Sequence, residues 1–86
     1  MSLSKAFHSA RGGSDFLGLR QGRSGDTEIV YDNGGAHREV WRVATPDAEP
    51  RRIGEALAAA VQELRVIPAL HLELKKRAIS IESVPV

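Results

Sequence analysis

The sequence predicts an α+β fold, in which a small antiparallel sheet of about five short strands, in the order βββαββ, carries one amphipathic helix on one face. Three patterns predict this class. Two β-prone runs flank an Asn-Gly-Gly connection at residues 33–35, apolar residues recur at helical spacing after Pro50, and leucines alternate with polar residues after Pro68. A chain of 86 residues makes one domain, which we expect to span residues 15–86 behind a flexible arm at 1–14.

The first strand is predicted at Phe16–Gln21, although Gly18 weakens the pattern. Residues 23–26, Arg-Ser-Gly-Asp, have the composition of a turn. Before this strand, the segment 2–14 offers one apolar pair, Ala and Phe, which is too little to order it as an independent element. We therefore expect a mobile arm or a short helix before the pattern changes at Phe16.

The clearest element is a hairpin made of Glu28–Asp32 and His37–Ala44. Its Asn-Gly connection takes positive φ at little cost, which is typical of tight hairpin turns. Because side chains alternate along a strand, Trp41 and Val43 share one face, which we predict to be buried. Their expected partners on the other strand are Ile29 and Tyr31.

One helix is predicted after the proline-rich connection that ends at Pro50, a residue suited to a first helical turn. Its apolar stripe consists of Ile53, Leu57, Ala60, Val61 and Leu64. Gly54 lies inside this helix and costs about 1 kcal/mol relative to alanine. We therefore expect Gly54 to mark close packing of the helix on the sheet.

Two more strands are predicted after Pro68, because the leucines of residues 70–74 alternate with polar residues and the alternation resumes at Ile79. A second helix over Ala69–Ala78 is the competing interpretation. A proline at its start and a glutamate four residues before an arginine favour this helix. The β-branched run that follows favours the strands.

Composition excludes several classes of protein. The chain has no cysteine, which excludes disulfides, a thiol nucleophile and iron–sulfur clusters and fits a reducing compartment. No run approaches the ~18 apolar residues of a membrane span, and the N-terminus lacks the apolar core of a secretory signal. With 42% apolar and 27% charged residues, we expect a soluble, cytoplasmic protein that has no membrane partner.

No catalytic, metal-binding or cofactor-binding motif stands out in the sequence. The histidines His8, His37 and His71 are far apart and lack carboxylates at ligand-like helical spacing. No serine occupies a Gly-x-Ser-x-Gly elbow, and no glycine cluster opens a helix as a phosphate loop does. We predict no enzyme, no metal and no cofactor, since catalysis would need a pocket in which His37 or His71 meets a carboxylate.

Basic residues supply the candidate binding site. Arginines at two positions of the second hairpin strand would share the outer face of the sheet, where they could contact phosphates. The residues predicted to contact nucleic acid are Arg20, Arg23, Arg38, Arg42, Lys75, Lys76 and Arg77. The competing interpretation is that the strand arginines pair with nearby acidic residues, namely Asp26, Glu28 or Glu39.

The sequence therefore favours a non-enzymatic module that binds protein, with an accessory or regulatory role. A thin aliphatic core, exposed strand edges and alternating charge indicate self-association as a homodimer, through strand addition or through helix pairing. A nucleic-acid-binding module that uses the arginine-bearing sheet face is the alternative.

Overall fold

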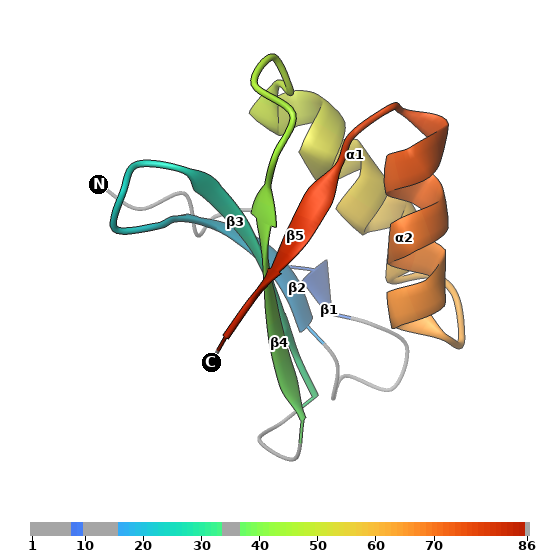
Figure 1. Ribbon diagram of the computed structural model, residues 1–86. Helices are drawn as coiled ribbons and strands as arrows, with labels where there is room; N and C mark the ends of the chain where they lie inside the picture. Colours follow the sequence, from blue (N-terminus) through green and yellow to red (C-terminus); the bar gives the residue numbers. More distant parts are fainter. Residues whose placement is uncertain (1–7, 10–15, 34–36, 86) are drawn as a thin grey trace.

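A computed structural model describes residues 8–9, 16–33 and 37–85 of the chain (Figure 1). Its elements, in chain order, are β1 (His8–Ser9), β2 (Phe16–Gln21), β3 (Thr27–Asp32), β4 (Arg38–Val43), α1 (Pro50–Ala60), α2 (Val66–Lys76) and β5 (Ile81–Val84). The strands form one antiparallel sheet in the order β1-β2-β3-β4-β5. Both helices lie on the same side of that sheet (Figure 1). The predicted α+β class and antiparallel sheet are confirmed.

The strand predicted at Phe16–Gln21 is β2, which has those bounds, and a tight turn joins it to β3. The Gly22 N–H donates to the Asp26 carbonyl across 2.7 Å, and the Gly25 N–H donates to the Gly22 carbonyl across 3.0 Å. Gly25 has a φ of 88°, a conformation that side chains disfavour. Of the expected N-terminal arm, the structure describes His8–Ser9, which form β1 and pair with β2; the other residues of the arm lie outside the described part of the chain.

The hairpin of β3 and β4 is confirmed. Ile29 lies directly opposite Trp41 in the register of the two strands, and both side chains are buried. Tyr31 lies opposite Glu39 on the same face. The Asn33 N–H donates to the His37 carbonyl at the end of the hairpin. Residues 34–36, which include most of the predicted turn, lie outside the described residues.

The hydrophobic core lies between the sheet and the two helices. Its buried residues are Leu17, Leu19, Ile29, Tyr31, Trp41, Ile53, Ala56, Leu57, Ala60, Val61, Val66, Leu70, Leu74 and Ile79. We call the sheet face that carries the first five of these residues the inner face. Val30 and Val40 alternate with them, are also buried, and belong to the outer face.

The first helix is shorter than predicted. It begins at Pro50, as expected, but it ends at Ala60 rather than at Leu64. After Ala60 the helix gives way to tighter 3₁₀-type turns, because the N–H groups of Gln62 and Glu63 donate to carbonyls three residues earlier instead of four. Leu64 therefore leaves the apolar stripe, and its side chain is 81% exposed.

Residues 69–76 are helical and 77–78 form a turn, so the prediction of a strand there is wrong. The decisive side chains are Leu70 and Leu74, which are 0% and 1% exposed, while Leu72 between them is 55% exposed. A strand would have placed all three leucines on one face, whereas a helix separates Leu72 from the other two. Pro68 fits near the helix start, where its missing N–H needs no partner. Of the two strands predicted after Pro68, one remains, as β5.

A compact turn ends α2 and returns the chain to the sheet. The Ile79 N–H donates to the Leu74 carbonyl and the Ala78 N–H donates to the Lys75 carbonyl, each across 3.0 Å. Ala78 has a φ of 58°. These are the two hydrogen bonds of a Schellman motif, and the buried side chains of Leu74 and Ile79 supply its apolar contact. Alanine occupies the position that usually favours glycine.

Gly54 does not mark close packing, contrary to the expectation from sequence. A Cβ atom built at this position meets no heavy atom within 4 Å beyond the helix's own backbone. The backbone at Gly54 is ordinary helix, which every residue can adopt. Nothing in the surroundings of Gly54 therefore requires glycine.

We predict that Gly54→Ala stabilises the protein by about 1 kcal/mol, because alanine removes the entropic cost of glycine inside a helix and meets no atom. Thermal unfolding followed by circular dichroism should show a rise in Tm of about 4 to 8 °C. An unchanged or lower Tm would mean that Gly54 makes a contact that the structure does not contain.

We also predict that Ala78→Gly stabilises the protein by about 1 kcal/mol, because glycine adopts positive φ without the steric strain of an alanine Cβ. Urea unfolding measures the change. Gly25→Ala is the matched control and should lower stability, since it places a side chain at positive φ. Equal stability of wild type and Ala78→Gly would contradict the assigned backbone conformation.

Candidate functional site

A row of four alternating charges crosses the outer face of the sheet. In register from β2 to β5 the row consists of Arg20, Glu28, Arg42 and Glu82. Arg20 Nε lies 2.8 Å from Glu28 Oε1, and the Arg42 guanidinium forms a hydrogen-bonded ion pair with Glu82. The bond with Glu82 raises the pKa of Arg42. Each arginine in the row therefore has its own carboxylate.

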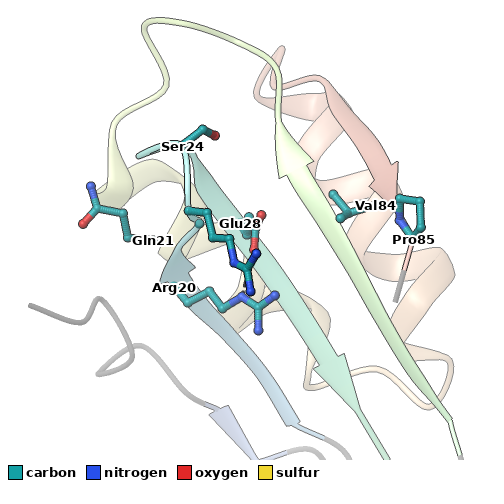
Figure 2. A pocket seen from close by; sticks show the side chains of 8 residues that line it. Arg20, Gln21, Ser24, Glu28, Val84 and Pro85 are labelled. Atoms are coloured by element: carbon teal, nitrogen blue, oxygen red, sulfur yellow. Dashed lines mark hydrogen bonds and ion pairs between the residues drawn. The ribbon is translucent and has the colours of Figure 1, made fainter.

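A hollow of about 660 Å³ lies beside this row (Figure 2). In Figure 2 Arg20 and Ser24 lie on one side of it, and Val84 and Pro85 lie on the other. Gly22 makes room for the carboxylate of Glu28, because a Cβ atom at Gly22 would lie 2.5 Å from Glu28 Oε2. The wall formed by β2 and β3 is thus occupied by an internal ion pair.

The structure divides the seven predicted nucleic-acid contacts between two layers. Arg20, Arg38 and Arg42 lie on the outer face, and Arg23 lines the hollow from the β2–β3 turn. The cross-strand neighbours of these strand arginines include Glu28, Glu82 and, for Arg38, Asp32. Lys75, Lys76 and Arg77 belong to the end of α2 and thus to the helical layer. The seven residues do not form one continuous basic surface.

Two of the three basic residues at the end of α2 have partners within the helix. Arg77 Nη1 donates to Glu73 Oε1 across 2.8 Å and to the Glu73 carbonyl across 3.0 Å, and Lys76 Nζ donates to Glu73 Oε2 across 3.3 Å. These contacts, led by the bond from Arg77, lower the pKa of Glu73. Arg52 on α1 also donates to the Arg77 carbonyl, which ties the helices together.

The histidines do not assemble a catalytic or metal-binding centre within the described residues. His37 Nε2 lies 2.6 Å from Glu39 Oε2, but both side chains are substantially exposed to solvent. His71 packs its ring edge-on to Trp41, with 5.7 Å between the ring centroids. No group of three potential metal ligands converges in the described part of the chain. Of His8 the structure gives the backbone, in β1.

A second hollow, of about 600 Å³, lies along α2 and the connection that precedes it. We call it the α2 groove. It is lined by Glu63, Leu64, Arg65, Pro68, Ala69, Leu72, Glu73 and Lys76. Leu64 and Leu72 are the two most exposed large apolar side chains among the described residues; the third, Phe16, is 39% exposed and lies on β2.

Helical geometry explains why the α2 groove faces outward. Arg65, Ala69, Leu72 and Lys76 follow one another at steps of four, three and four residues, so they share one face of the helix. The buried residues Val66, Leu70 and Leu74 lie on another face, and Ala69, between the two faces, is partly buried against the core. Sequence reasoning missed this surface because it placed a strand here. The same spacing, read as a helix, would have found it.

Comparison of the chain with models of known families, with curated proteins and with solved structures finds no match. Within the described residues, no helix is both long and apolar enough to span a bilayer.

The lowered pKa of Glu73 predicts an acid-dependent contribution to stability. A carboxyl whose pKa is depressed by folding stabilises the protein above its unfolded pKa of about 4.3, and the contribution disappears as pH falls through the folded value. Glu73→Gln should therefore be less stable than wild type at pH 7, and the difference should shrink as pH falls toward about 2.

Urea midpoints of wild type and Glu73→Gln between these pH values measure this convergence. The control is Glu55→Gln, because Glu55 is exposed and lies 3.9 Å from its nearest cation, Arg51. This control should change the midpoint little at any pH. A gap between Glu73→Gln and wild type that stays constant with pH would show that the Arg77 contact does not depend on the ionised carboxylate.

Proposed function

We propose that this protein is a non-enzymatic protein-interaction module that docks a protein partner in the α2 groove and associates with itself. The observation that carries the proposal is the pair of exposed leucines, Leu64 and Leu72, beside the small residues Pro68 and Ala69 in one hollow. Apolar side chains gathered in a groove and rimmed by charges are typical of protein interaction sites.

The charges at the free edge of β5 disfavour self-association by strand addition, which leaves the α2 groove as the better docking site. The Ala44 N–H donates to the Ser80 carbonyl, so the backbone groups of Ser80 and, two residues on, Glu82 face β4. An added strand would therefore pair with Ile81 and Ser83. When Ile81 of one copy pairs with Ser83 of the other, Glu82 lies directly opposite Glu82 of the second copy, and like charges so placed destabilise a sheet.

The outer face of the sheet gives less support to the nucleic-acid alternative. The two glutamates of the charge row compensate Arg20 and Arg42 within the protein, and carboxylates beside a phosphate backbone are repulsive. A nucleic-acid site would need those ion pairs to open.

The non-enzymatic part of the proposal is supported by the exposure of the His37–Glu39 pair, which lies outside both hollows.

We predict that Leu72→Asp weakens self-association, because the carboxylate would have to be desolvated in the docked state. Sedimentation velocity across protein concentrations of about 1 to 1000 μM measures this, a range that covers typical weak protein complexes. Wild type should shift toward a larger species as concentration rises, and Leu72→Asp should remain the smaller species throughout.

Phe16→Asp is the matched control, because it adds the same charge at an exposed apolar residue on the sheet. It should associate as wild type does, and circular dichroism should show that both variants are folded. The proposed function fails if wild type stays monomeric at every concentration, or if Phe16→Asp rather than Leu72→Asp removes the larger species.

A further inference from the structure

We propose that the α2 groove is filled by the α2 groove of a second copy of this chain, with the two helices antiparallel across a two-fold axis near Ala69. This inference rests on the proposed function and adds to it the identity of the partner and the geometry of docking. It is carried by the order of the charges along the groove.

The charged residues that line the groove alternate in sign. In chain order they are Glu63, Arg65, Glu73 and Lys76. When a second copy runs antiparallel, Glu63 meets the second copy's Lys76, and Arg65 meets the second copy's Glu73. Symmetry repeats both contacts, so four attractive pairs surround the apolar centre. A parallel arrangement would instead place each of the four residues against its own copy and make all four contacts repulsive.

The same two-fold axis relates the Glu63–Lys76 contacts and the Arg65–Glu73 contacts. The midpoint between Glu63 and Lys76 falls between positions 69 and 70, and the midpoint between Arg65 and Glu73 is position 69. Both midpoints therefore fall within one residue of Ala69 in the chain; Arg65 is the N-cap residue of α2, and Glu63 lies in the α1–α2 connection before it. A groove whose charges had another spacing would satisfy one pair and miss the other.

The residue at the centre of the face allows two helices to approach. Ala69 is small, so two helix axes can come within the ~8 Å of a close contact. Leu72 of each copy then lies between Arg65 and Ala69 of the facing helix, where its apolar surface leaves water. Glu73 can take part although it already binds Arg77 and Lys76, because each carboxylate oxygen accepts more than one hydrogen bond.

The size of the groove predicts a weak dimer. A standard interface buries about 800 Å² on each partner, or about a seventh of the 5503 Å² surface of this protein. A helix of 11 residues, about 16 Å long, presents less than that on one face. We therefore expect association that depends on concentration rather than a permanent dimer.

The test reverses one charge at a time and then combines the variants. Glu63→Lys and Lys76→Glu each turn two attractive contacts of the symmetric dimer into repulsive ones, so each variant alone should associate about tenfold more weakly than wild type. An equimolar mixture of the two should form a heterodimer of wild-type strength, since every contact between the copies is then attractive. The double variant should recover self-association.

Lys75→Glu is the matched control for Lys76→Glu, because it makes the same charge change one residue away and outside the groove. Alone it should associate as wild type does, and its heterodimer with Glu63→Lys should be weaker than the wild-type dimer, because one of the two end contacts stays repulsive. Sedimentation equilibrium of each variant and of both mixtures gives the dissociation constants. Circular dichroism and thermal unfolding establish that each chain is folded.

The outcomes separate this inference from the proposed function. A heterodimer of wild-type strength in the mixture and a recovered double variant, with a weaker heterodimer in the control mixture, support antiparallel pairing of α2. The inference is overturned if wild type dimerises, Leu72→Asp abolishes the dimer, and the mixture of charge variants still fails to associate; the groove then remains a docking site with another geometry. A wild type that is monomeric at every concentration overturns the inference and the self-association together.

Discussion

Burial of Leu70 and Leu74 against the core is the interaction on which the rest of the structure depends. It fixes which side of α2 faces the sheet, and therefore which side faces solvent. It also positions the Leu74 carbonyl for the hydrogen bond from Ile79, which turns the chain back toward β4. The placement of β5 beside β4 and the exposure of Leu72 are both consequences of this one contact.

Charged residues are arranged differently on the outer face of the sheet and around the α2 groove. On the outer face of the sheet, Arg20 and Arg42 each bind a glutamate of a neighbouring strand, which leaves little of their charge for a partner. Around the α2 groove, Glu73 also binds Lys76 and Arg77, but Glu63 and Arg65 lie beside exposed leucine and have a charge order complementary to that of Glu73 and Lys76 at the other end of the groove. The helical layer is therefore better suited to association than the sheet.

Local sequence patterns predicted the hairpin and the first helix well. The errors arose where contacts between residues far apart in the chain determine the secondary structure or the partner of a side chain. The β3–β4 hairpin was predictable because Ile29 and Trp41 are near neighbours in the chain. The leucines of residues 70–74 fit a strand and a helix almost equally, and burial of two of them without Leu72 depends on tertiary packing. Likewise, the partner of Arg42 lies 40 residues away, on β5. The α2 groove could not be found until its helix was recognised.

Because the chain contains no cysteine, introduced thiols can test whether α2 or the edge of β5 joins two copies. Ala69→Cys places a thiol beside the proposed axis, and Glu82→Cys places one where β5 would face its own copy if Ile81 paired with Ser83 across a two-fold axis. Mild oxidation of each variant, followed by non-reducing electrophoresis, reads out the disulfide-linked dimer. We expect a dimer from Ala69→Cys that disappears when Leu72→Asp is added, and little dimer from Glu82→Cys. Efficient cross-linking of Glu82→Cys without that of Ala69→Cys would contradict pairing through α2.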